Sequence, residues 1–198
     1  HLVPGPQVPD GAGETNLTTT LQPGTHAIIC LVDVPDKVPH FAKGMMRELT
    51  VVPAAGSAPA PTTDVTIVMK DYTWAIEPAL TAGKHTIRLE NAGPQPHELV
   101  LVRVADGKTP ADVGAWAATF AGPPPFTFAG GSSMMAVGDV AFMETTLTPG
   151  MYMALCFYPD EKDGKLHAWQ SDTWASGGLG GGGLNADLFP YVFRNVPH

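Results

Sequence analysis

The stretch Leu147-Thr-Pro-Gly-Met-Tyr-Met-Ala-Leu-Cys156 reads as a tight turn that leads into a short buried strand. The chain carries a second version of it, Leu21-Gln-Pro-Gly-Thr-His-Ala-Ile-Ile-Cys30. In both copies Pro-Gly is the turn signal, and the apolar run that follows is too short for a helix. Two copies of one supersecondary unit indicate two related domains rather than one large one.

Short runs of the same kind recur along the chain, separated by turns rich in Gly and Pro, of which there are 22 and 20. This pattern is typical of a many-turned β protein. The runs are Arg47–Val52, Asp64–Met69, His85–Glu90, Glu98–Arg103 and Phe142–Leu147. Only Thr109–Phe120 indicates a helix, with Thr109 as N-cap and Pro110 at the first helical position. The sequence therefore predicts an all-β fold, either a β-sandwich or a barrel, with one complete and one partial unit.

The two copies differ in what precedes them. Strand patterns begin at Val65 for the second copy, whereas fewer than thirty residues precede Cys30 in the first. We therefore predict a partial unit over residues 1–53, a Pro/Ala-rich linker over 54–63, a complete domain over 64–175, and a Gly-rich segment with a strand candidate over 176–198. The last segment is a candidate for the missing strand of the partial unit, in its own chain or in a neighbour. That hypothesis includes self-association.

The composition argues against some classes of binding partner and favours one cellular compartment. The formal net charge of −8 argues against nucleic acid and anionic membranes, which both attract basic surfaces. No apolar run reaches the roughly 20 residues that a membrane-spanning helix needs, so no transmembrane span is expected. Low Lys content and only two Cys suit a periplasmic or extracellular protein.

Each cysteine is followed by a loop and a histidine at nearly the same spacing. Nine residues separate Cys30 from His40, and ten separate Cys156 from His167. A second histidine, His97, enters the strand Glu98–Arg103, and Met45 follows His40 closely. A thiolate, two imidazoles and a weak thioether form the ligand set of copper electron-transfer sites. The candidate metal ligands are therefore His97, Cys156 and His167 in the second unit, and Cys30, His40 and Met45 in the first.

Structural alternatives exist for each of these residues. Cys30 and Cys156 can form one disulfide, or can be buried free thiols that pack as small apolar groups. His40 and His167 can be ordinary loop residues, and Met45 can belong to a core. The acidic run Asp160-Glu-Lys-Asp163 is interpreted as a solvated turn, since it lacks the spacing of a calcium loop.

Taken together, these motifs resemble the cupredoxin family, the plastocyanin-like type 1 copper domains that occur singly or in tandem in bacterial exported proteins. The matching segments are Asn91-Ala-Gly93 to His97-Glu98, Leu147 to Phe157, Asp163-Gly164 to His167, and Pro39 to Met45 with Glu48 to Val51. The resemblance implies an antiparallel Greek-key β-sandwich, a mononuclear copper cofactor, and electron transfer or copper handling. Its partners would be a redox protein or a copper donor or acceptor.

Two positions depart from the family pattern. No Met follows His167, where Gln170 is a candidate axial ligand instead, and the upstream histidine of the first unit has only His1 as a candidate. An alternative function is an extracellular structural or assembly subunit with vestigial copper sites, polymerising by strand complementation. A copper enzyme such as a nitrite reductase is a third reading. We expect no enzyme, because the extra His-x-His or His-Cys-His runs of such enzymes do not occur.

Overall fold

A computed structural model of the chain describes residues 3–7, 14–32, 36–56, 58–71, 73–167 and 192–196. The chain divides into a larger compact unit, residues 1–19 with 61–198, and a smaller one, residues 20–60. Strand β1 (Asn16–Thr18) pairs with β9 (Val140–Leu147) of the larger unit. The N-terminal residues thus lie with the larger unit, whereas the sequence places them in the partial one; the domain assignment itself stays a prediction.

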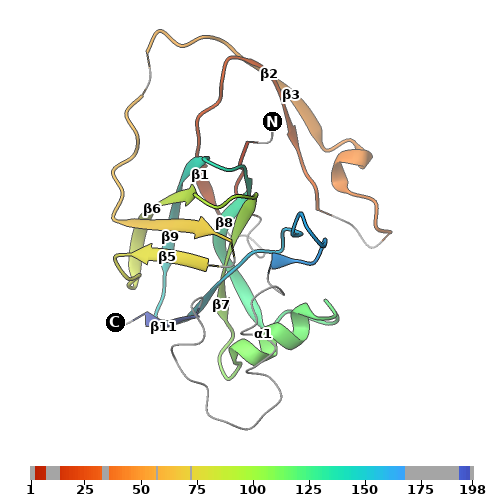
Figure 1. The fold of residues 1–198 in the computed structure, drawn as a ribbon, viewed down its shortest axis with the longest axis vertical. Coiled ribbons are helices and arrows are strands. Elements are labelled where there is room, and N and C mark those ends of the chain that lie inside the picture. The colour runs from red at the N-terminus through yellow and green to blue at the C-terminus, as the bar shows by residue number, and fades with distance from the viewer. Residues whose placement is uncertain are drawn as a thin grey trace. The chain divides into compact units, whose positions relative to one another are not determined.

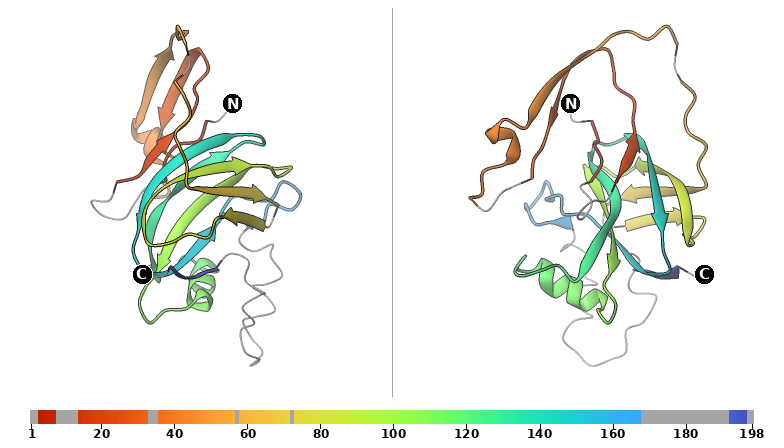
Figure 2. Two further views of the ribbon diagram at one scale, coloured as in Figure 1. Left: turned by 90° about the vertical axis from the view of Figure 1, so that its left-hand side faces the viewer. Right: turned by 180° about the vertical axis from the view of Figure 1, so that it is seen from behind.

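The larger unit consists of two β-sheets (Figures 1 and 2). The first has the order β1, β9, β6 (Gly83–Asn91), β4 (Val65–Lys70), β5 (Thr73–Glu77). The second has the order β11 (Val192–Val196), β10 (Gly150–Leu155), β7 (His97–Val104), β8 (Phe126–Met135). The pairs are antiparallel except for β4 with β6, which are parallel. The predicted all-β sandwich is confirmed.

The main core lies between the two sheets and follows the two-residue period of the strands. In β4, alternate side chains are buried, and Ile67 is fully inaccessible to solvent. Leu89 of β6 faces the same core, as do Leu99 and Leu101 of β7 and Tyr152 of β10. Each buried side chain of this size contributes about 1.5–3 kcal/mol through removal of apolar surface from water.

A second apolar cluster lies on the opposite face of the second sheet. Helix α1 (Pro110–Ala117) packs Val113 and Trp116 against Val100 and Val102, which alternate along β7 with the main-core residues. Strand β7 is therefore buried on both faces, which explains its uninterrupted apolar run. The helix begins with the predicted cap: Thr109 Oγ1 accepts the Asp112 N–H, and the Asp112 carboxylate accepts the Thr109 N–H in return. The predicted helix is confirmed.

In both units a side chain after the repeated Pro-Gly turn is hydrogen-bonded to the backbone of the residue four positions earlier. The buried hydroxyl of Tyr152 accepts the Thr148 N–H and donates to the Thr148 carbonyl oxygen, both at 3.0 Å. In the smaller unit, His26 Nε2 donates to the carbonyl oxygen of Gln22 at 2.7 Å, also four residues back. In both copies the side chain two residues after the Pro-Gly glycine therefore ties the strand to the turn before it.

The smaller unit is a pair of antiparallel strands, β2 (Gly24–Ile29) and β3 (Met46–Val51), with a 3-10 turn η1 (His40–Lys43) between them. Among its described residues no second sheet covers the hairpin. Large apolar side chains are consequently exposed, including Ile28 and Met46 at 62% each and Val52 at 71%. A lone two-stranded hairpin is marginally stable in water, which agrees with the expectation of a partial unit.

The C-terminal strand candidate does form a strand, β11, but it belongs to the second sheet of the larger unit. It pairs antiparallel with the edge strand β10, matching Gly150 with Val196 and Met153 with Val192. The Gly-rich run over residues 176–183 lies outside the described residues, as do His1 and Gln170. In the described part of the chain, α1 is far too short to cross a bilayer, and no other helix is long enough to do so.

Candidate metal centre

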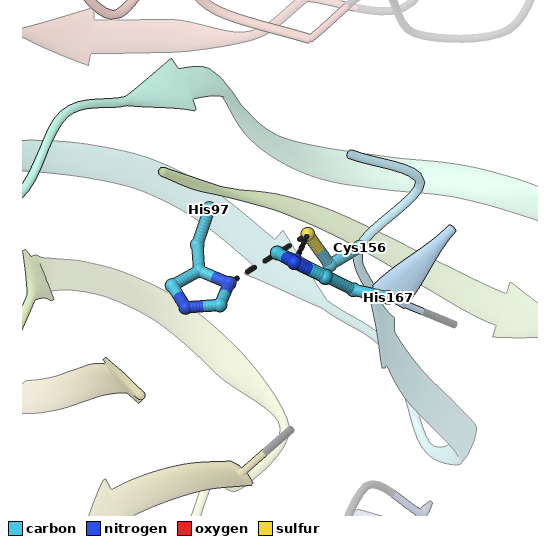
Figure 3. Close-up of side chains that lie close together, drawn as sticks. All are labelled: His97, Cys156 and His167. Atoms are coloured by element: carbon cyan, nitrogen blue, oxygen red, sulfur yellow. Dashed lines mark hydrogen bonds between the residues drawn. The ribbon is translucent and has the colours of Figure 1, made fainter. Parts of the chain in front are cut away.

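Three side chains from distant parts of the sequence meet at one end of the second sheet. His97 begins β7, Cys156 follows the last residue of β10, and His167 follows the next loop. Because β7 and β10 run antiparallel and adjacent, the start of one strand lies beside the end of the other. One ring nitrogen of each histidine and the Cys156 Sγ lie within 4.8 Å of one another. In Figure 3 both rings turn Nδ1 toward the sulfur.

The distances within this cluster fit a small cation. Cys156 Sγ lies 3.4 Å from Nδ1 of His167 and 4.0 Å from Nδ1 of His97. The two imidazole rings have their centroids 4.7 Å apart. All three side chains are buried, with between 3% and 6% of their surface exposed. Among the described residues this is the one group of His, Cys and acidic side chains arranged to hold a metal ion.

The turn before His97 is held by a buried asparagine. Asn91 donates through Nδ2 to the carbonyl oxygens of Gln95 and Met135, and its Oδ1 accepts the Gly93 N–H. Gly93 packs so closely that a Cβ there would lie 2.7 Å from His97 Nε2. The Asn-x-Gly sequence that reads as a turn therefore also sets the position of the first histidine.

The loop that carries His167 is closed by its own backbone. The His167 N–H donates to the Tyr158 carbonyl oxygen at 2.9 Å, and the Asp160 N–H donates to that of Lys165 at 2.7 Å. Gly164 stands in the left-handed region with φ of +71°, which a side chain would disfavour. These bonds and this turn return the chain to the sulfur of Cys156.

Hydrogen bonds assign the proton of the first imidazole. His97 Nε2 lies 3.1 Å from the Asp71 carboxylate, which can only accept, so Nε2 carries the hydrogen. The lone pair of the neutral ring is then on Nδ1, the atom that faces the sulfur. Burial lowers the pKa of His97, and the nearby His167 lowers it further, although Asp71 raises it. Burial also lowers the pKa of His167. Both rings are therefore suited to be neutral ligands near pH 7.

The sulfur is a thiol when nothing is bound to it. Burial raises the pKa of Cys156 to about 12, although the N–H of Glu98, 3.4 Å away, favours the thiolate. A metal must therefore displace a proton from this residue on binding. The Glu98 carboxylate also accepts the Phe157 N–H at 2.8 Å, which ties the chain after the cysteine to β7.

The smaller unit brings only part of its predicted ligand set together. Cys30 Sγ lies 3.5 Å from His40 Nδ1, and the Cys30 N–H donates to the Met45 carbonyl oxygen at 3.2 Å. The Met45 side chain is 59% exposed. His1, the candidate for the second imidazole, lies outside the described residues. Both Cys30 and Cys156 are free, so the disulfide alternative is wrong.

Three polar residues beside the cluster were not singled out by the sequence. Asp71 and Asp160 lie next to the outer nitrogens of His97 and His167, and Gln95 is hydrogen-bonded to both carboxylates. Asp160 is only 3% exposed, so the interpretation of its run as a solvated turn is wrong at this position. The acidic turn is the loop that returns to His167, and its first carboxylate points inward. Nothing in the local sequence distinguishes this Asp from the exposed acidic residues that follow it.

Taken together, these features define a class of protein: a β-sandwich with a buried site of one thiol and two neutral imidazoles. No family model matches the chain, and no curated protein matches it. Solved structures similar to it include an auracyanin from the photosynthetic bacterium Roseiflexus castenholzii, with 19% identity over 50% of this chain and 88% of that one, at a TM-score of 0.35. Auracyanin B is similar with 23% identity over 50% and 81%, at 0.33.

A third similar structure is the blue copper oxidase of Nitrosomonas europaea. It has 17% identity, covers 74% of this chain and 54% of that one, and has a TM-score of 0.26. All three TM-scores are low, so the proposal that follows rests on the geometry of this chain itself.

Proposed function

We propose that this protein is an extracytoplasmic, cupredoxin-like copper-binding protein that transfers electrons or handles copper. His97, Cys156 and His167 are its ligands in the larger unit. The observation that carries the proposal is the convergence of two imidazole nitrogens and one Sγ within 4.8 Å in a buried site. One soft sulfur with two imidazoles suits copper, which supplies one-electron chemistry when bound.

Hydrogen bonds within the protein hold the ligand side chains of this site in position. Asp71 holds the His97 proton on the outer nitrogen, and the Asn91 turn and the closed loop before His167 hold the rings in place. The Glu98 N–H donates to the sulfur. Donors that are already positioned need little rearrangement when the metal changes charge, which is what rapid electron transfer requires. A redox protein or a copper donor or acceptor is the partner proposed for this site.

The smaller unit is proposed as a second, less complete copper site. Its Cys30 and His40 face each other, and Met45 is bound through its backbone to the cysteine. The pair lacks an identified second imidazole among the described residues, and Cys30 is only partly buried. Copper is therefore expected to bind here more weakly than at Cys156.

A second candidate function is a structural or assembly subunit. The exposed apolar side chains of Ile28, Met46 and Val52 favour it, because surfaces of this kind commonly contact another chain. Sedimentation across a dilution series tests it. A mass that rises with concentration supports assembly, whereas a constant monomer mass contradicts it. Neither candidate is an enzyme.

The main test is a titration of the metal-free protein with Cu(II), followed by optical absorption and paramagnetic resonance. An intense thiolate-to-copper band is expected in the wild type and retained in Cys30→Ser, whereas Cys156→Ser should keep at most the weaker band of the Cys30 site. Cys30→Ser is the matched control because it removes the other thiol and leaves the buried cluster intact. A band as intense in Cys156→Ser as in the wild type, or no band in any variant, would contradict the proposal.

A further inference from the structure

The outer nitrogens of both histidines face carboxylates. His97 Nε2 donates to Asp71 Oδ1 at 3.1 Å. On the other ring, Nε2 of His167 lies 3.8 Å from Oδ2 of Asp160. Asp71 follows β4, whereas Asp160 belongs to the loop after Cys156. The two acidic groups therefore come from parts of the chain that are far apart in the sequence.

One buried amide joins the two carboxylates. Gln95 Nε2 lies 3.1 Å from Asp71 Oδ2 and 3.0 Å from Asp160 Oδ2, and donates one hydrogen to each. The orientation of the amide is set by its other end, because Gln95 Oε1 accepts the Glu161 N–H at 3.1 Å. Gln95 is 5% exposed, so water competes little for these bonds. We call Asp71, Gln95 and Asp160 the carboxylate bridge.

A further backbone bond holds Asp160 in place, because its Oδ1 accepts the Lys162 N–H at 2.7 Å inside its own loop. The main chain at Asp71 lies against Gly93, where an added Cβ would come within 3.2 Å of the Asp71 backbone nitrogen and 2.7 Å of His97 Nε2. The bridge therefore packs closely against the turn before His97.

The charge of the bridge acts on the metal through the rings. A carboxylate behind an imidazole makes the ring a stronger donor and adds a negative charge one ring-width from the metal. Negative charge in a poorly solvated site stabilises the ion of higher charge more than the ion of lower charge.

Resting on the function proposed above, we infer that the carboxylate bridge is a positioning device that biases the site toward the divalent metal ion. The bound copper is held preferentially as Cu(II), with a reduction potential lower than the three ligands alone would set. The roles within the bridge differ: Asp71 and Asp160 supply the charge, and Gln95 holds both carboxylates against the rings.

The test is the reduction potential of the copper-loaded protein, measured by spectroelectrochemistry, in Asp71→Asn and Asp160→Asn. Both substitutions keep the size of the side chain and remove one charge. Each is expected to shift the equilibrium toward Cu(I) by about tenfold, which for one electron is a rise of about 59 mV. The Cu(I) affinity of the metal-free variants, measured by competition with a chromogenic chelator, should rise relative to their Zn(II) affinity.

The matched control is Asp163→Asn, in the same loop as Asp160. Its side chain is 38% exposed and pairs with Lys165 at 3.1 Å, away from the rings. Removing this charge is expected to shift the equilibrium less than twofold. Gln95→Met keeps the charges but frees the carboxylates, and should change the copper resonance spectrum without removing the thiolate band.

The outcomes separate the two proposals. A wild-type thiolate band with potentials that are the same in Asp71→Asn, Asp160→Asn and Asp163→Asn overturns the inference and leaves the function standing. No thiolate band in the wild type overturns both. If Asp160→Asn does not fold, the decision rests on Asp71→Asn, whose side chain is 22% exposed and which lies at a strand end.

Discussion

The hydroxyl of Tyr152 offers a sharp test of how the repeated turn stabilises the larger unit. The side chain is 2% exposed, and its ring belongs to the main core. Its oxygen accepts the Thr148 N–H and donates to the Thr148 carbonyl oxygen, both at 3.0 Å. Tyr152→Phe keeps the ring and removes only the oxygen, so the change in stability reports on these two bonds and on the 3.3 Å contact between the hydroxyl and Thr148 Oγ1.

The expected loss follows from what the bonds contribute net of water. Each contributes about 0.5–1.5 kcal/mol, and a buried group left without a partner costs more. Thr148 is exposed, so water can satisfy part of what the hydroxyl leaves behind. We therefore expect a loss of about 1–2 kcal/mol in the free energy of unfolding. For a unit of this size the melting temperature should fall by about 2–8 °C.

The assay is urea denaturation of the metal-free protein followed by circular dichroism. With a urea dependence of about 2 kcal/mol per molar, the midpoint should fall by about 0.5–1 M. His26→Ala is the matched control: it removes the same four-residue contact in the exposed hairpin and should leave this transition unchanged. A midpoint for Tyr152→Phe that equals that of the wild type would refute the reasoning. A similar loss in His26→Ala would refute it as well.

Two further predictions concern the larger unit. Ile67→Ala empties a fully buried position of the main core and should cost about 2–5 kcal/mol in urea denaturation; a cost below about 1 kcal/mol would mean that the core collapses around it. Asp64→Asn should make the free energy of unfolding depend less on pH between pH 5 and pH 3. Burial raises the pKa of Asp64, but bonds from the Thr86 N–H and the His85 ring outweigh it and leave the pKa below 3.8. A lowered pKa contributes stability above pH 3.8 that is lost as the pH falls, so the wild type should lose more than the variant between pH 5 and pH 3 in urea midpoints.

The strands and the helix could be predicted from local patterns because each pattern has one physical cause. Alternation in Val65–Lys70 reflects a strand with one face in the core. The Thr109 cap with Pro110 marked the helix start, and the uninterrupted apolar run of β7 reflects burial on both faces. The parallel pairing of β4 with β6 could not be predicted, since it depends on which distant strand lies alongside.

The residues of the candidate site were likewise predictable where the signal is local in the sequence. The matched Cys-loop-His spacing singled out Cys156 and His167, and the turn that enters the strand Glu98–Arg103 singled out His97, because turns and strand ends are local features. The same spacing singled out Cys30 and His40, which do lie 3.5 Å apart. Whether these residues bind copper stays a prediction.

The sequence by itself thus determined the β-sandwich, the helix and the residues that can act as ligands, because hydrophobic period, turn chemistry and donor type are written in neighbouring residues. Only the tertiary structure decided that Asp71, Gln95 and Asp160 join behind the two rings. It also decided that Asp160 is buried while Asp163 in the same acidic turn is not. Burial and charge at a site depend on which distant strands and loops enclose it, and that is settled only when the sheets pack.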